Sequence, residues 1–371
     1  MVFLSELLFV IFSCYGILVL YLLIGWISSK TNVPIISSPT TKISILVPFR
    51  NEEDNIETCI ESLAKLDYPT ELFEIILIND NSEDNSAAIV NNKIISLTNF
   101  KLLNLEGAKG KKASIALGIS VSKHSLITTT DADCTFQKNW LSTLSYFYQD
   151  THAKMIIAPV LFKHNNLFSK IQALDFLSLT GTMISSHSLN QKILSNGANL
   201  TFEKSAFNAV NGYADIDSIP TGDDILLMQK FAKTYPEGIK TIKNKNSVVF
   251  TKPAHNWAEF VNQRVRWASK IGSHQNIFSK ILGAIVLLTN ASLLVVLGLT
   301  VINIKLVEFF LVPFALKCFI DFLFLFLVAF SFKEKRLLWL IIFTEIFNVF
   351  VIPIITIASF FKGYSWKGRQ Y

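Results

Sequence analysis

The sequence predicts a mostly parallel α/β domain that lies between membrane-spanning segments, and two observations lead to this prediction. The chain of 371 residues is 51% apolar and only 17% charged, against roughly 25% charged residues in typical soluble domains, and the apolar excess lies at its two ends. The polar middle alternates short apolar runs with stretches of helical periodicity. This composition excludes disordered, collagen-like and secreted disulfide-rich proteins.

The first apolar segment, residues 2–27, is long enough to cross a bilayer, which takes about 20 residues. Glu6 is its one charged residue, and no Lys or Arg precedes it, so the segment lacks the basic start of a cleaved signal peptide. We therefore expect residues 1–29 to be an uncleaved anchor. Lys30 and Lys42 follow the anchor, which places the next domain in the cytoplasm by the positive-inside rule.

The other apolar end, residues 281–361, is predicted to contain about three transmembrane segments. Their approximate bounds are 282–303, 306–331 and 337–361. The break at 332–336 carries three basic residues and should be cytoplasmic. Three crossings would leave the basic tail, 362–371, outside, which the positive-inside rule disfavours. A last segment that bends back instead of crossing is the alternative.

The middle of the chain, residues 40–280, is predicted to form one α/β domain with C-terminal interfacial helices. Its strands are predicted at 43–48, 73–78 and 126–130, and its helices at 51–65 and 84–97. In such sheets ligands bind at the carboxyl ends of the strands. The polar residues that directly follow these strands should therefore share one pocket. They are Asn51, Glu52, Asp80, Asp131 and Asp133.

Asp131 and Asp133 are candidate metal ligands. They flank one small residue at a predicted strand end, and alternate residues of an extended segment point the same way. Two carboxylates that converge in this manner suit Mg²⁺ or Mn²⁺ bridging a nucleotide diphosphate, because such cations prefer oxygen ligands and leave positions for phosphate. A solvated acidic turn is the alternative. The four cysteines of the chain show no metal-ligand spacing.

A second acidic pair, Asp223 and Asp224, immediately precedes a helical run. Acidic side chains at a helix start interact favourably with the helix dipole, which is one explanation for the pair. A displacement by a hydroxyl group also needs a carboxylate that accepts the hydroxyl proton while a metal stabilises the departing phosphate. Both explanations can hold, because a helix start fixes a carboxylate rigidly.

Residues 263–267 precede the C-terminal apolar region and read Gln-Arg-Val-Arg-Trp. On a helix, Gln263, Arg266 and Trp267 would share one face. An arginine can hold a diphosphate through two hydrogen bonds, and an indole can cover a sugar ring. A basic, aromatic anchor at the membrane interface explains the same residues, so the spacing alone does not choose between the two roles.

These motifs resemble those of membrane-bound family 2 glycosyltransferases with a GT-A catalytic domain. That family includes the ceramide glucosyltransferases and, more distantly, the processive cellulose, chitin and hyaluronan synthases. The resemblance spans about 45–267 and depends on five short landmarks that occur in the family's order. The landmarks are 47–53, 78–82, 130–133, 222–224 and 263–267.

The resemblance implies roles for individual residues. It assigns donor binding to Pro48, Arg50, Glu52, Asp80, Lys111, Lys112, Asp131, Gln263, Arg266 and Trp267. It assigns the metal to Asp131 and Asp133, and Asp224 aligns with the catalytic base. The chain departs from the family at Asp223, which stands in place of the usual Glu and shortens the side chain. Residues 196–199 resemble a small-residue segment near the donor sugar and the acceptor.

The implied function is inverting transfer of a sugar from a nucleotide-diphosphate donor, UDP-linked by expectation, to a hydroxyl of a membrane lipid or lipid-linked acceptor. A processive polysaccharide synthase is the alternative, and a catalytically silent binding partner is a third. Mg²⁺ or Mn²⁺ is the expected cofactor, and no nucleic-acid module is present. We expect an integral protein of the bacterial inner membrane with its catalytic domain in the cytoplasm.

Two further features concern the membrane region. Lys317 and Asp321 are four residues apart in one segment, where they could pair or mark a substrate path. Residues 364–369 resemble an ending seen in some lipid-modifying members of the family, although their basic residues could equally anchor lipid headgroups.

Overall fold

The structure is a computed structural model that describes residues 2–30, 40–107, 109–217, 219, 222–269, 276–361, 363, 365–366 and 369–370. The chain divides into two compact units. The sheet unit consists of Lys30–Phe162 and Leu194–Lys252. The helical unit consists of Met1–Ser29, Lys163–Ile193 and Pro253–Tyr371.

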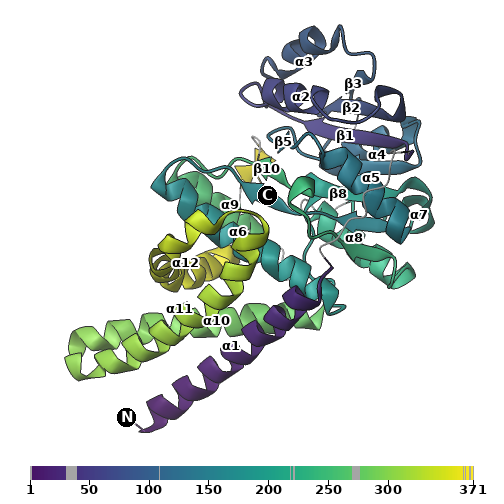
Figure 1. Cartoon of the computed structure of the whole chain (residues 1–371). Helices are drawn as coiled ribbons and strands as arrows, with labels where there is room; N and C mark the ends of the chain where they lie inside the picture. The colour runs from purple at the N-terminus through teal and green to yellow at the C-terminus, as the bar shows by residue number, and fades with distance from the viewer. Residues whose placement is uncertain are drawn as a thin grey trace. The chain divides into compact units, whose positions relative to one another are not determined.

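The sheet unit is built on a seven-stranded sheet with the order β3-β2-β1-β4-β8-β6-β9. Figure 1 labels β3, β2, β1 and β8 of this sheet. The strands are β1 (Ile43–Phe49), β2 (Phe73–Asn79), β3 (Phe100–Asn104), β4 (Leu126–Thr129), β6 (Met155–Ile157), β8 (Leu200–Glu203) and β9 (Ile239–Thr241). β3, β2, β1 and β4 run parallel, β8 is antiparallel to both of its neighbours, and β6 pairs with β9 in parallel. Every residue of β1 and β2 is buried, as expected for strands covered on both faces. The predicted mixed, mostly parallel α/β architecture is confirmed.

Helices connect and cover these strands. They are α2 (Ile56–Ala64), α3 (Ser86–Ile94), α4 (Lys111–Val121), α5 (Trp140–Thr151), α7 (Lys204–Ala209) and α8 (Asp223–Thr234). α4 packs on β1 and β2, and Gly118 permits this close approach, since a Cβ there would lie 3.0 Å from the side chains of Leu46 and Ile78. A small second sheet contains β5 (Thr135–Phe136), β10 (Val249–Thr251) and β7 (Val160–Phe162) in that order.

The helical unit contains the predicted membrane segments. Among the described residues, four stretches are long and apolar enough to span a bilayer: Val2–Ser28, Ile277–Ile302, Ile304–Ser331 and Lys335–Phe361. They comprise α1 (Val2–Ser28), α10 (Ile277–Ile302), α11 (Val307–Ser331) and α12 (Ile341–Phe361). Leu8, Phe12, Leu293, Val296 and Val349 form a buried apolar cluster between α1, α10 and α12. Lys362 and Lys367 of the predicted basic tail are outside the described residues.

Two further helices, α6 (Leu167–Ser188) and α9 (Trp257–Ser269), also belong to the helical unit. They come from chain segments that we expected to be part of the 40–280 domain. α6 packs on α1, where Gly25 allows the two backbones to approach: a Cβ at Gly25 would lie 2.4 Å from the carbonyl oxygen of Ser185. The hydroxyl of Ser188 donates a hydrogen bond to the carbonyl of Gly25.

A buried charged cluster joins three of the apolar helices. The ammonium group of Lys317 lies 2.8 Å from Asp321 on α11 and also contacts the carboxylate of Glu345 on α12. The Tyr15 hydroxyl of α1 donates to Asp321 at 2.6 Å. The pairing expected for Lys317 and Asp321 is therefore present. Because buried charges need partners in an apolar medium, these contacts favour one arrangement of the three helices.

Candidate functional site

The candidate site lies where three parallel strands of the sheet unit end. The loops that follow β1, β2 and β4 begin at this edge, and they carry the polar residues that the sequence pattern predicted there. Asn51 and Asn81 have left-handed backbone conformations, with φ of 51° and 54°. Asparagine tolerates this conformation, so the chain can turn sharply directly after each strand.

Asp80 is a buried carboxylate that organises the loops around it. Both of its side-chain oxygens accept the backbone N–H of Gly110, at 3.0 and 3.1 Å. The Arg50 guanidinium donates to the backbone carbonyl of Asp80 at 3.0 Å, to that of Asn81, and to the Glu83 carboxylate at 2.7 Å. Arg50 thus braces the loop after β2, and a direct contact with the nucleotide stays a prediction.

Pro48 lies in β1, and Glu52 lies in the loop that follows this strand. Pro48 is buried within β1. Glu52 is 7% exposed, its carboxylate accepts from the Asn55 amide at 2.7 Å, and its backbone N–H donates to the Ser86 hydroxyl at 2.7 Å. The bond to Ser86 ties the loop after β1 to the start of α3.

Lys111, the first residue of α4, joins the two acidic pairs. Its ammonium nitrogen lies 2.5 Å from Asp131 Oδ1 and 3.8 Å from Asp223 Oδ2. Burial disfavours the charged ammonium, but the carboxylates of Asp131 and Asp223 outweigh this effect and raise the pKa of Lys111. Two motifs that are more than ninety residues apart in the sequence therefore meet through one lysine.

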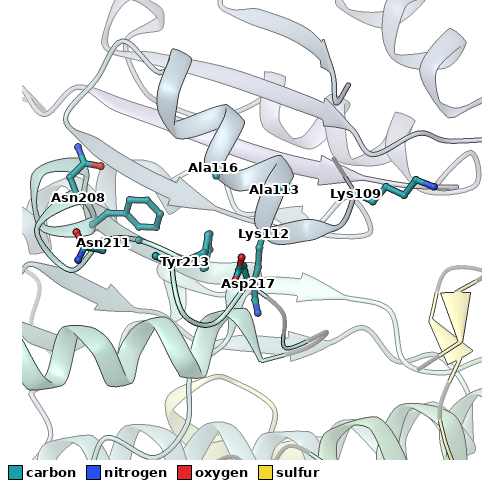
Figure 2. Close-up of a pocket in the computed structure, with 11 residues that line it drawn as sticks. Lys109, Lys112, Ala113, Ala116, Asn208, Asn211, Tyr213 and Asp217 are labelled. Atoms are coloured by element: carbon teal, nitrogen blue, oxygen red, sulfur yellow. The ribbon is translucent and has the colours of Figure 1, made fainter. Parts of the chain in front are cut away.

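Lys112 points elsewhere. Its ammonium group donates to the backbone carbonyls of Ile216 and, at 2.6 Å, of Ile219, in the segment that leads to α8. Lys112 also lines a cavity of about 430 Å³. Figure 2 shows Lys112 and Ala113 on α4 beside the loop that carries Tyr213 and Asp217. The other candidate lysine, Lys111, contacts the predicted metal ligand Asp131.

The Asp131–Asp133 pair offers the chemistry of a hard-metal site. Asp133 Oδ2 accepts a hydrogen bond from the Thr251 hydroxyl at 3.0 Å, which holds this carboxylate in place. Burial, and then the charge of Asp133, raises the pKa values of the nearby thiols of Cys59 and Cys134, which disfavours their thiolate forms. The remaining donors are carboxylate oxygens, which fit Mg²⁺ or Mn²⁺.

The described part of the chain offers a divalent cation few side-chain ligands. Within the described part of the chain, no group of three or more His, Cys, Asp and Glu side chains is arranged to hold a metal. A divalent cation at Asp131 and Asp133 would therefore need further oxygen ligands from a bound molecule. Diphosphate oxygens meet that requirement.

Asp224 is held in a defined orientation at the start of α8. Its Oδ2 atom accepts the backbone N–H of Gly197 at 3.0 Å, and its Oδ1 atom accepts that of Ile225 at 2.9 Å. The Thr129 hydroxyl donates to the Gly197 carbonyl at 2.8 Å, which ties this contact to the end of β4. The predicted base thus lies beside Gly197, in the segment 196–199. Thr221, which precedes this motif, is outside the described residues.

Gly222 places both aspartates. It precedes α8 with φ of 84°, in the left-handed region that other residues enter at a cost of about 1–2 kcal/mol. We expect Gly222→Ala to lower the thermal unfolding midpoint and to reduce transfer, because the strain shifts the start of the helix. Gly222→Asn is the matched control, since asparagine tolerates this conformation better, and it should retain more of both properties. Equal behaviour of Ala and Asn would contradict this role.

The third motif lies on α9 of the helical unit. There the Arg264 guanidinium lies 2.6 Å from the Asp175 carboxylate of α6 and over the ring of Trp267, 4.6 Å from its centroid. Trp267 also packs against Phe176, with ring centroids 5.6 Å apart. Gln263 and Arg266 are half-buried on the same helix. Arg264 was not predicted as important, and only its location between the motif residues could have drawn attention to it.

The contacts of Trp267 sharpen the test of its role. We expect Trp267→Ala to reduce transfer strongly, Trp267→Phe to restore it partly, and Trp267→Leu to restore it hardly at all. A flat ring can still stack on Phe176 and under Arg264, whereas a branched aliphatic chain cannot. Transfer rates at matched membrane insertion provide the measurement. Full activity of Trp267→Leu would favour the alternative, in which residues 263–267 are only an anchor at the membrane interface.

Comparison with known proteins agrees with the resemblance to family 2 glycosyltransferases. Residues 44–210 match the model of the family described as Glycosyl transferase family 2. The chain is 28% identical over 239 residues to a poly-beta-1,6-N-acetyl-D-glucosamine synthase of Staphylococcus epidermidis, covering 63% of this chain and 55% of that protein. It is 32% identical over 115 residues to glycosyltransferase GlyG of Streptococcus pneumoniae, covering 31% of this chain and 38% of that protein.

The chain therefore spans about half the length, or less, of these curated relatives. Among solved structures, it resembles the mannosyltransferase PcManGT of Pyrobaculum calidifontis in complex with GDP-Man and Mn²⁺. The TM-score is 0.57 at 14% identity, over 90% of this chain and 98% of that one. This similarity supports the GT-A fold.

Proposed function

We propose, because residues 44–210 match the Glycosyl transferase family 2 model, that the chain transfers a sugar, with inversion, from a nucleotide-diphosphate donor to a hydroxyl of a membrane lipid or lipid-linked acceptor. The observation that supports this most strongly is the convergence of Lys111, Asp131, Asp223 and Asp224 at the carboxyl ends of the parallel strands. This edge is where such sheets bind nucleotides.

In the proposed mechanism, Asp224 accepts the proton of the attacking hydroxyl. Each oxygen of this carboxylate accepts one backbone N–H, from Gly197 or Ile225. A carboxylate oxygen has two lone pairs, so each can still accept a hydroxyl proton. The bonds to rigid backbone groups hold the base in one orientation, which supports a single displacement without a covalent enzyme intermediate.

The residues that would hold the cation and the diphosphate lie close to this base. Asp131 and Asp133 would hold Mg²⁺ or Mn²⁺, and the cation would supply charge neutralisation for the departing diphosphate. Lys111 is placed to add a second positive charge beside the phosphates. Asp80 and Glu52, both buried at the ends of their strands, would contact the nucleotide.

A lipid acceptor is supported by the membrane character of the chain. Four apolar helices among the described residues indicate membrane association. We propose that the catalytic unit faces the cytoplasm of a bacterial inner membrane, since Lys30 and Lys42 follow the first apolar helix and the two curated relatives named above are bacterial.

A processive polysaccharide synthase is a second candidate, favoured by the similarity to the poly-beta-1,6-N-acetyl-D-glucosamine synthase. The two candidates differ in their product. Membranes that contain the protein should be incubated with a panel of labelled nucleotide sugars, and both the lipid extract and the aqueous phase should be analysed by mass spectrometry. Lipid carrying one added sugar supports the proposal, whereas labelled polymer supports the synthase. No product from any donor would contradict both.

A further inference from the structure

The ammonium group of Lys111 occupies the centre of the acidic site. It lies 2.5 Å from Asp131 Oδ1 and 3.8 Å from Asp223 Oδ2, and its side chain is 19% exposed. A Cβ atom on Gly197 would lie 3.2 Å from this nitrogen and 3.5 Å from both Asp223 Oδ2 and the Cβ of Asp224. The lysine is therefore packed among three carboxylate residues rather than extended into solvent.

Several carboxylates lie around the ammonium group of Lys111. Lys111 contributes one positive charge beside Asp131, Asp223 and Asp224, and Asp133 adds a further carboxylate two residues from Asp131. The ammonium group is thus in direct contact with one predicted metal ligand, Asp131.

We propose that Lys111 is the counter-cation of the donor-free site and competes with the divalent metal for Asp131. A metal would then bind tightly only together with the donor diphosphate, which gives Lys111 a new anionic partner and frees the Asp131 carboxylate. This inference rests on the proposed function, because it assumes that Asp131 and Asp133 hold the metal. The site would then assemble fully only when the donor is present.

The position of Lys111 in the chain suits such an exchange. As the first residue of α4, it lies at a helix N-terminus, where the helix dipole also favours a bound phosphate. Its side chain has four rotatable carbon–carbon bonds, so the ammonium group can move from Asp131 to a phosphate oxygen without movement of the helix. The neighbouring Lys112 cannot substitute for it while its ammonium group is bonded to Ile216 and Ile219.

The test measures Mn²⁺ binding by electron paramagnetic resonance on the purified full chain, with and without UDP. We expect the unmodified protein to bind Mn²⁺ weakly alone and much more tightly with UDP. Lys111→Met should bind Mn²⁺ alone about tenfold more tightly, or better, because an adjacent positive charge is gone. Lys109→Met is the matched control: it removes the same charge from an exposed position two residues away and should leave Mn²⁺ binding unchanged.

Two further variants keep the test decisive. Lys111→Arg retains the charge and should bind Mn²⁺ alone as weakly as the unmodified protein, and Lys111→Gln should reproduce Lys111→Met if the latter misfolds. Equal Mn²⁺ affinities of all variants without UDP, together with UDP-dependent binding, would overturn the inference and leave the proposed metal site intact. Absence of Mn²⁺ binding both with and without UDP would contradict the proposed metal site itself.

Discussion

Asp224→Asn is expected to slow sugar transfer by about 10²–10⁴-fold, the usual contribution of a general base. The amide has nearly the same shape as the carboxylate, so the fold should persist, although its single oxygen can keep only one of the two N–H bonds that Asp224 accepts from Gly197 and Ile225. It cannot accept the proton of the attacking hydroxyl. Turnover under saturating donor and acceptor measures the effect, and donor affinity should change little.

Asp223→Asn is the comparison variant, since Asp223 lies at the same helix start and contacts Lys111 at 3.8 Å. We expect it to retain far more activity than Asp224→Asn, because its proposed part is electrostatic. If Asp224→Asn lost nucleotide affinity as steeply as turnover, Asp224 would be a donor-binding residue and the assignment of the base would be wrong.

Asp133→Ala is expected to abolish transfer and to weaken nucleotide binding. The diphosphate would lose the cation that offsets its charge, and Asp131 alone is already paired with Lys111. Transfer rate and UDP affinity should be measured at several Mn²⁺ concentrations. Asp54→Ala, at an exposed acidic residue in the loop after β1, removes the same charge and should be close to neutral. Full activity of Asp133→Ala in the presence of EDTA would exclude the metal role.

The parts of the fold that the sequence made predictable are those with strong local patterns. β1, β2 and β4 are buried apolar runs of four to seven residues, and the structure places them within one residue of their expected bounds. β6 and β9 escaped prediction because each has three residues, too few for a periodic pattern. β8 pairs antiparallel with β4 over a separation of more than seventy residues, which no local signal reveals.

In the candidate site too, features with a local sequence pattern could be predicted, and features that depend on tertiary contacts could not. Asp80, Asp131 and Asp133 could be expected together because the ends of parallel strands meet at one edge. The direction of a long side chain is decided by tertiary contacts, so the sequence could not show that Lys111 turns to Asp131 while Lys112 turns to Ile216. The assignment of α6 to the helical unit also depends on packing, in particular on its contact with α1 at Gly25.

The stereochemistry of transfer tests the central claim most directly. A single displacement with Asp224 as base requires that the bond to the anomeric carbon forms on the face opposite the departing diphosphate. The product should be isolated from a reaction with an α-linked nucleotide sugar, and its anomeric configuration should be determined by nuclear magnetic resonance. The account predicts a β-linked sugar from the unmodified protein and a greatly reduced yield from Asp224→Asn. An α-linked product would contradict it.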